Sequence, residues 1–253
     1  MYRGKQIGVV VPAYNEEPHI AAVLEGMPDF VDRVYVVDDA STDATNHIAK
    51  GCEDGRVVVV CHEVNRGVGG AIVTGYQRCL ADDIDIAAIM AGDNQMDGAE
   101  LPRLLDPIVD GVADYAKGDR TSRREHLAGM SLWRRSGNWL LMWLTRIAVG
   151  NKKLMDPQNG YTAASRELLA VLPLERLYPH YGYCNQLLSW LSLRNRRVVE
   201  VPMPARYLGE VSKIRYSVYV PKVSWLLLGL LVCRVLASPV AREGSARHYQ
   251  QQP

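Results

Sequence analysis

The sequence lacks a charge excess, a regular spacing of cysteines and a long hydrophobic run, and each absence excludes a class of protein. A formal net charge of +1 over 253 residues provides no global field for nucleic acid, so none is expected as a partner. The five cysteines are scattered without C-x-x-C spacing, which indicates neither a disulfide framework nor a zinc site and fits a reducing cytoplasm. The longest apolar stretch, residues 223–233, falls short of the roughly 20 residues that a membrane-spanning helix needs.

No signal peptide is expected either, since the apolar run at residues 7–11 ends at Pro12 and has the pattern of a buried strand. Hydrophobic residues make up 48% and charged residues 23% of the chain, an ordinary globular composition that argues against disorder. The length suits one sizeable domain, or one domain with a short appendage. We therefore expect a folded cytoplasmic protein with one main core.

Short β-branched runs alternate with helical patterns in the first half of the chain. Strands are expected at residues 7–11, 33–38, 56–61 and 86–90, with helices at 17–27, 43–51 and 70–81 between them. This order is typical of βαβ units and a mostly parallel sheet, and continuous apolar strands need helices on both faces. The expected fold class is α/β, a Rossmann-like sheet with flanking helices that binds ligands outside the carboxyl ends of its strands.

Polar clusters follow the first three of these strands. In residues 12–16 a tyrosine beside a carboxylate suits a base and ribose, although a turn with a helix-start glutamate explains the same residues. Asp38 and Asp39 form a costly carboxylate pair unless they bind something, whereas helix capping explains residues 41–43. Residues 65–70 open the third helix, where free backbone amides favour anions, but the motif is weak and does not match a nicotinamide site.

The fourth cluster, residues 92–97, places the Asp93 carboxylate and the Gln95 amide oxygen two residues apart. Such oxygen ligands suit a hard cation that bridges a diphosphate. His62 is isolated in the sequence and is assigned no role.

The second half of the chain interleaves aromatic and basic residues. A helix is expected at 131–149, which carries three tryptophans, with Arg134 and Arg135 near its start and Arg146 near its end, and another helix is expected at 217–237. Both fit a membrane interface, although a buried core helix explains the same aromatic stripe. Residues 238–253 lose apolar periodicity and are expected to form a flexible tail. Tyr178, Tyr181 and Tyr183 line an acceptor channel or form a surface aromatic cluster; the sequence leaves both open.

The order of the motifs resembles a known family. PAYNE at 12–16, VVDDAST at 36–42, NRGVGGA at 65–71 and MAGDNQMD at 90–97 are similar to the family 2 glycosyltransferases of GT-A fold, and most to the dolichyl-phosphate mannose synthase group and its bacterial polyprenyl-phosphate relatives. The similarity continues at residues 117–120, 156–161, 200–202 and 212–213, and so covers about residues 7–214. It implies a GT-A catalytic domain over residues 1–216.

The resemblance also implies roles for individual residues. It assigns Asp93, Gln95, Arg120 and Lys213 to catalysis, with Asp93 and Gln95 as ligands of Mg²⁺ or Mn²⁺. The phosphates of the donor or of a lipid-phosphate acceptor would meet Arg120, Arg206, Ser212 and Lys213. Nucleotide binding falls to Pro12, Ala13, Tyr14, Glu16, Val37, Asp39, Gly69, Ala91 and Gly92.

Two departures from the family pattern bear on the reaction. Ala91 stands where the first carboxylate of Asp-x-Asp is expected, so the metal would be held chiefly by Asp93, Gln95, water and the substrate. Gln186 stands where an acidic residue is expected, and an amide cannot serve as general base. Because a phosphate monoester is already ionised, the missing base favours a lipid phosphate as acceptor.

The leading hypothesis is an inverting glycosyltransferase that moves a sugar from a UDP- or GDP-sugar to a polyprenyl phosphate, peripheral on the cytoplasmic face of a membrane. Two alternatives stay open: a soluble glycosyltransferase with a hydroxyl acceptor, and a non-catalytic nucleotide-sugar-binding protein. The sugar, the nucleotide, the lipid and the oligomeric state are not determined by the sequence.

Overall fold

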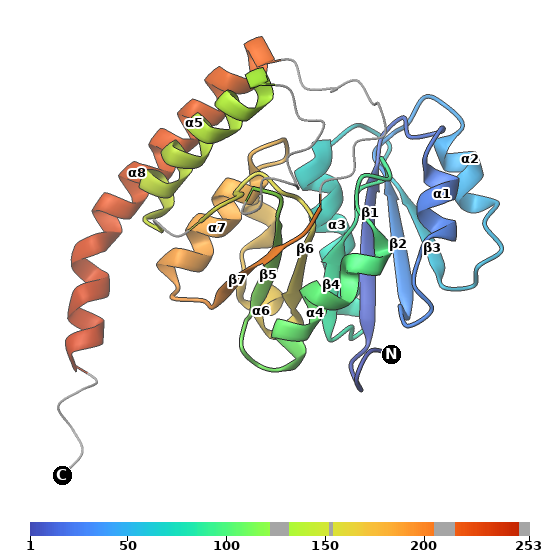
Figure 1. Cartoon of the computed structure of the whole chain (residues 1–253), viewed down its shortest axis with the longest axis horizontal. Helices are drawn as coiled ribbons and strands as arrows, with labels where there is room; N and C mark the ends of the chain where they lie inside the picture. Colours follow the sequence, from blue (N-terminus) through green and yellow to red (C-terminus); the bar gives the residue numbers. More distant parts are fainter. Residues whose placement is uncertain (122–131, 152–153, 205–215, 248–253) are drawn as a thin grey trace.

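The computed structural model describes residues 1–121, 132–151, 154–204 and 216–247 and is built around a seven-stranded sheet (Figure 1). The strand order is β3-β2-β1-β4-β6-β5-β7, and β6 is antiparallel to both of its neighbours. The other strand pairs are parallel. The strands are β1 (Ile7–Ala13), β2 (Arg33–Asp38), β3 (Val57–Cys61), β4 (Ile86–Ile89), β5 (Tyr115–Asp119), β6 (Thr162–Ser165) and β7 (Val198–Pro202).

Helices cover both faces of this sheet, as continuous apolar strands require. One face packs against α1 (Ile20–Glu25), α2 (Thr45–Lys50) and α4 (Leu101–Val109). The other packs against α3 (Gly67–Ala81), α6 (Arg166–Val171) and α7 (Tyr183–Leu193). Two 3₁₀ turns, η1 (Gly98–Glu100) and η3 (Leu174–Arg176), precede α4 and α7. The layered, mostly parallel α/β class predicted from the sequence is therefore confirmed.

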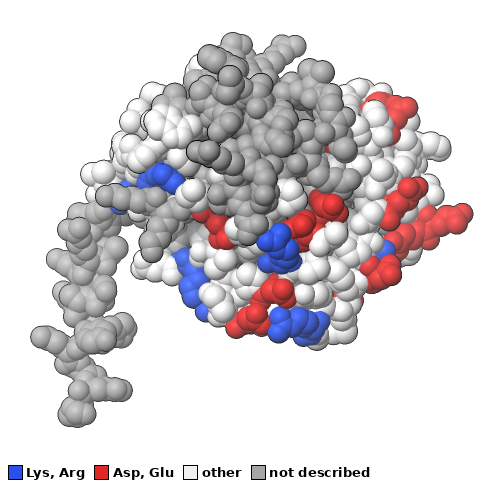
Figure 2. All heavy atoms as spheres, viewed as in Figure 1, with Lys and Arg blue, Asp and Glu red and all other residues white. Residues whose placement is uncertain are grey.

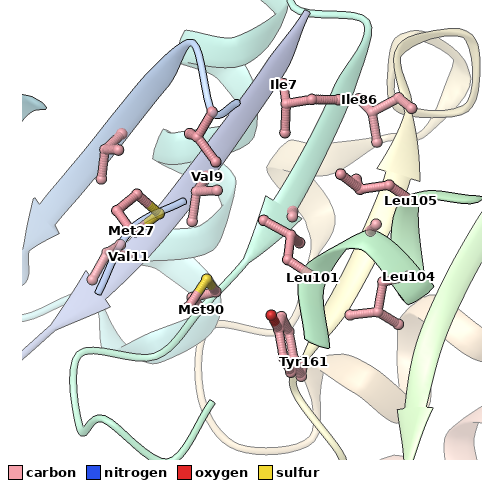
Figure 3. Close-up of a cluster of buried hydrophobic side chains, with 14 of the residues drawn as sticks. Ile7, Val9, Val11, Met27, Ile86, Met90, Leu101, Leu104, Leu105 and Tyr161 are labelled. Atoms are coloured by element: carbon pink, nitrogen blue, oxygen red, sulfur yellow. The ribbon is translucent and has the colours of Figure 1, made fainter. Parts of the chain in front are cut away.

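The side chains of β1 alternate between two cores. Val9 and Val11 point into the cluster shown in Figure 3, where they meet Met27 and the α4 leucines, whereas Val10 joins the opposite cluster. All three valines are fully buried. On the Val10 side, α3 approaches β1 so closely that a Cβ on Gly75 would lie 2.1 Å from Val10 Cγ1. The sheet and its helices thus form a rigid frame for the loops at the carboxyl edge.

Two long helices, α5 (Leu132–Val149) and α8 (Tyr216–Arg247), lie side by side beyond α7 at the left of Figure 1. Ala148 on α5 and Val223, Leu227 and Leu230 on α8 form a small core between them. α8 extends past residue 237, where the sequence predicts a flexible tail, to Arg247. Residues 238–247 contain Pro239 and Gly244 as well as good helix formers, so local helix propensity alone does not explain the extension.

Within the described ranges, every helix falls short of the combined length and apolarity that a bilayer crossing demands.

Candidate active site

The loops after β1 and β2 are joined by side-chain hydrogen bonds at the carboxyl edge of the sheet. The backbone N–H of Asn15 donates to Ser41 Oγ at 3.0 Å, and that of Glu16 donates to Thr45 Oγ1 at 2.8 Å. The N–H of Thr42 in turn donates to Asn15 Oδ1 at 2.8 Å. The sequence predicts that residues 41–43 cap α2. The helix begins after Ala44 without a side-chain cap, although Asp43 Oδ1 accepts the N–H of Thr45 at 3.0 Å. The expectation is therefore wrong for Ser41 and Thr42. These residues instead hold the two loops together.

The paired carboxylates at the end of β2 are both buried and both bound by the chain itself. Asp38 accepts from Asn46 Nδ2 at 2.8 Å and from the N–H of Ser41 at 3.2 Å. Asp39 accepts from the backbone N–H groups of Arg66 and Gly67, each at 2.8 Å. The sequence argument that such a pair needs a binding partner holds, but the partners within the described chain are its own donors.

His62, to which the sequence assigned no role, completes the Asp39 site. Its Nδ1 lies 2.7 Å from Asp39 Oδ1, and its Nε2 lies 2.9 Å from Thr74 Oγ1 on α3. Because a carboxylate only accepts hydrogen bonds, Nδ1 carries a proton in this arrangement. The signal available in the sequence was weak: a lone histidine directly after a strand end.

The amides at the start of α3 are occupied by the chain, which corrects the expectation that they are free for an anion. The carboxylate of Asp39 takes the N–H of Gly67, and Pro179 O accepts from Gly69 at 2.8 Å and Gly70 at 3.3 Å. A Cβ on Gly69 would lie 2.1 Å from Tyr178 O. The glycines therefore permit close approach of residues 178–180, and Asp39 is the anion at this helix start.

The loop after β4 brings the predicted metal residues to the same edge. Gly92 donates its N–H to Pro12 O at 3.2 Å, and a Cβ on it would lie 3.4 Å from Glu16 Cγ. Asp93 Oδ1 accepts the N–H of Gln95 at 3.1 Å, across Asn94 with a positive φ of 59°. Asp93 and Glu16 are thus on adjoining loops, as the motif order predicts.

Tyr181, which precedes α7, belongs to this carboxylate-lined edge. Burial raises the pKa of its phenol, and the charges of Asp93 and Glu16 raise it further. The side chain is nonetheless 47% exposed, whereas Tyr183 is almost fully buried in the core. Of the predicted tyrosine channel, Tyr181 faces the site and Tyr183 supports it from below.

A second polar network lies beyond β5. Arg120 donates to Asp156 through Nε at 2.7 Å and through a terminal nitrogen at 3.1 Å. Burial alone would raise the pKa of the Asp156 carboxyl, but the charges of Arg120 and Lys117 outweigh it and lower that pKa. Fully buried Lys117 bonds to Asp156 O and lies 3.7 Å from Glu200 Oε1. This network fixes residues 155–156 beside Arg120.

Gln186, at the position where the resemblance implies an acid, is engaged by the backbone of its own chain. Its Oε1 accepts the N–H of Tyr178 at 2.5 Å, and its Nε2 donates to Arg176 O at 3.2 Å. A carboxylate could make only the first of these bonds, because it has no donor. The amide therefore holds residues 176–178 in place.

The remaining predicted residues divide into three groups. Tyr14 is exposed and Ala91 half-buried at the edge, where a ligand can reach them. Pro12, Ala13, Val37 and Gly92 are buried, and Val37 is 0% exposed, so these residues lie beneath the edge and present little surface to a ligand. Arg206, Ser212 and Lys213 lie outside the described residues.

The chain is similar to known proteins over most of its length. The chain is 29% identical over 218 residues to the UDP-N-acetylglucosamine–dolichyl-phosphate N-acetylglucosaminyltransferase of Methanococcus voltae, covering 80% of this chain and 86% of that one. It is 30% identical over 208 residues to the undecaprenyl-phosphate mannosyltransferase of Micrococcus luteus, covering 79% and 84%.

Among solved structures, glucosyl-3-phosphoglycerate synthase of Mycobacterium tuberculosis in complex with Mn²⁺, UDP and phosphoglyceric acid superposes with a TM-score of 0.64 at 27% identity, covering 91% of this chain and 78% of that one. The GT-A fold is thereby confirmed. The model of the glycosyl transferase family 2 domain matches residues 8–172, which span β1 to α6 and include the polar loops after β1, β2, β3 and β4. The chain therefore belongs to glycosyl transferase family 2.

Proposed function

We propose that this protein transfers a sugar from a UDP- or GDP-sugar to a polyprenyl phosphate at a membrane surface, with inversion at the anomeric carbon. The observation that carries the proposal is a pair of exposed apolar faces on α5 and α8. They lie next to residues 177–182, the segment that connects α8 with the edge of the sheet where Asp93 lies. The relatives from Methanococcus voltae and Micrococcus luteus, whose names specify dolichyl and undecaprenyl phosphate, support it.

The apolar faces follow from helical periodicity. On α8 the residues at 223, 227 and 230 pack against α5, while a second stripe at 225, 228, 232 and 235 stays exposed. Trp225 is 78% exposed on that stripe. Among the described side chains of α5, the exposed large apolar residues are Trp139, Trp143, Leu144 and Ile147. An amphipathic surface of this kind, with tryptophan among aliphatic residues, suits the boundary between lipid headgroups and acyl chains.

Basic groups accompany these faces. Arg146 lies over the Trp143 ring, 5.2 Å from its centroid, and Arg234 donates to Ile147 O at 2.9 Å. Lys222 is exposed at the start of the α8 stripe. Cations beside an apolar face favour an anionic cytoplasmic leaflet, so we place the protein peripherally on that side. On the face drawn in Figure 2, basic and acidic side chains are mixed near the centre of the molecule, and acidic side chains predominate at its right-hand edge.

The donor would bind at the carboxyl edge of β1 to β4. Tyr14 and Glu16 would contact the base and ribose beside the loop that Asp39 organises, and the diphosphate would lie next to Asp93. A divalent metal fits the oxygen donors of Asp93 and Gln95, and it would neutralise the diphosphate as it leaves. In the described part of the chain no three acidic, histidine or cysteine residues cluster, so the diphosphate and water would supply the other ligands.

The acceptor chemistry follows from Gln186. Both polar atoms of its amide are used by residues 176–178, so this position cannot deprotonate a hydroxyl. A phosphate monoester needs no base, because its oxygen is already ionised. This oxygen attacks the anomeric carbon while the bond from that carbon to the diphosphate oxygen breaks, and the configuration at the anomeric carbon is inverted. Arg120, oriented by Asp156, would present N–H donors to a phosphate there.

The experiment is an acceptor panel. Purified full-length protein is incubated with labelled UDP- and GDP-sugars, Mn²⁺ or Mg²⁺, and either polyprenyl phosphate, the matching polyprenol or 3-phosphoglycerate. We expect label in a butanol-extractable product with polyprenyl phosphate and none with polyprenol. Equal transfer to polyprenol would contradict the phosphate acceptor, and no lipid product from any donor would reject the proposal.

A second candidate, transfer to a small water-soluble phosphorylated acid, is favoured by one observation. The Mycobacterium tuberculosis enzyme with the same fold was crystallised with phosphoglyceric acid. Label in phosphoglycerate but not in lipid would establish this function instead. Nucleotide binding without transfer to any acceptor would indicate a non-catalytic protein.

A further inference from the structure

Residues 177–182, between η3 and α7, connect the donor edge with the apolar helix pair. At one end, Pro179 O accepts the N–H groups of Gly69 and Gly70 at the start of α3. At the other end, a Cβ on Gly182 would lie 3.0 Å from Leu226 Cδ2 of α8. Tyr181 lies between these two contacts, half-exposed, with the Asp93 and Glu16 charges acting on its phenol. It is therefore placed where donor diphosphate and lipid would meet.

We propose that Tyr181 is an acceptor-binding residue, whose hydroxyl donates a hydrogen bond to the acceptor phosphate and whose ring contacts the first apolar carbons of the chain. This inference rests on the proposed function and names one contact within it. A phenol has a polar tip and an apolar body, as a junction between an ionic site and a lipid surface requires. Because the phenol is neutral, it can donate a hydrogen bond to a phosphate without attracting the Asp93 and Glu16 carboxylates away from the donor.

The other two tyrosines of the segment do not fit this role. Tyr183 is only 5% exposed and packs within the core beneath the site. The ring of Tyr178 supports the turn, since its Cδ1 would lie 3.4 Å from a Cβ on Gly182. Gln186 then acts as a positioning residue for Tyr181, because its amide fixes residues 176–178 through two backbone hydrogen bonds.

The test measures acceptor binding directly by calorimetry. Full-length protein with Mn²⁺ and UDP or GDP is titrated with farnesyl phosphate, with farnesol and with inorganic phosphate. We expect Tyr181→Phe to bind farnesyl phosphate about tenfold more weakly, the effect of losing one hydrogen bond to a charged group, with unchanged farnesol and nucleotide affinity. Tyr2→Phe, the same substitution at the opposite edge of the sheet, should change nothing.

The Gln186→Met variant, which removes both backbone contacts, should raise KM for the acceptor and leave the KM for the nucleotide sugar and the folding midpoint close to wild type. Combined with Tyr181→Phe, its effect on farnesyl phosphate affinity should be less than additive, because both changes act on one contact. Additive effects would overturn the positioning role.

The outcomes separate this inference from the proposed function. Unchanged farnesyl phosphate affinity in Tyr181→Phe, or a loss confined to nucleotide affinity, overturns the assignment even if the wild type transfers sugar to lipid. If the wild type binds inorganic phosphate as tightly as farnesyl phosphate, the proposed contact between the Tyr181 ring and the apolar chain is wrong. If the wild type binds farnesyl phosphate through Tyr181 but transfers no sugar in the acceptor panel, the proposed function fails and the contact stands.

Discussion

At the residue scale, Asp39 shows how one buried carboxylate can organise a binding loop. It accepts from the amides of Arg66 and Gly67 and from His62, and it is 3% exposed. Its negative charge at the start of α3 compensates the positive end of that helix. The loop that would face a nucleotide is therefore fixed before any ligand arrives.

Replacing Asp39 by asparagine turns one acceptor atom into a donor that must face an amide or His62. We expect the free energy of unfolding to fall by about 1–3 kcal/mol, the cost of an unsatisfied buried group. Urea unfolding measures this loss. Glu63→Gln removes the same charge from an exposed position on the loop after β3, next to His62, and should be within about 0.5 kcal/mol of wild type. A loss no larger than that of the control would contradict the role of Asp39.

Asp156 makes stability depend on pH in a defined direction. Its pKa is lower in the folded protein than the usual value of about 3.9, so its ionised form stabilises the fold above that pH and the stabilisation is lost as pH falls. We expect Asp156→Asn to cost about 3 kcal/mol at pH 7, because it removes the carboxylate charge that Arg120 binds. The difference from wild type in urea unfolding should narrow below about pH 4. A difference independent of pH would show that the charge is not responsible.

At the element scale, segments that pack closely on α3 leave no room for a side chain at Gly69. A Cβ on Gly69 would collide with Tyr178 O, whereas a Cβ on Gly229 in α8 meets nothing within 4 Å. We expect Gly69→Ala to lower stability by about 1–3 kcal/mol through overpacking, while Gly229→Ala is neutral or gains up to about 1 kcal/mol of helix propensity. Thermal unfolding of the two variants compares them; similar melting temperatures would contradict the close approach.

Elements of the first half were predictable from the sequence, and those of the second half were less so. β1 to β4 are short, mostly apolar runs bounded by turn residues, and their length and composition indicate buried strands. β5 (YAKGD) and β6 (TAAS) carry few β-branched residues and become strands because neighbouring strands pair with them. Tertiary context, which a local pattern does not contain, decides such segments.

At the scale of the whole molecule, an apolar helix pair stands beside a polar catalytic body (Figure 1). We expect Trp225→Glu to abolish co-sedimentation with anionic vesicles, because it places a charge on the exposed stripe of α8. Transfer to farnesyl phosphate without a bilayer should be retained. Val171→Glu, at an exposed apolar position on α6, is the matched control and should sediment like the wild type. Equal sedimentation of both variants would contradict membrane docking through α8.

The meeting of four motifs, far apart in sequence, at one edge of the sheet was predictable because parallel strands place their carboxyl ends together. The partners of those motifs were not predictable. His62 on Asp39, Pro179 on the α3 amides and the use of Gln186 by residues 176–178 are contacts between distant segments. A spacing pattern identifies chemical groups, but the fold decides which of these groups form hydrogen bonds within the chain.

The central claim is that the loops after β1, β2 and β4 form one donor site, and a crystal structure with Mn²⁺ and UDP or GDP tests it most directly. We predict an anomalous manganese peak at coordination distance from the Asp93 carboxylate, with the diphosphate beside it and the base next to Tyr14. A nucleotide bound at the amino edge of the sheet, or a manganese peak that persists unchanged in Asp93→Ala, would contradict the account.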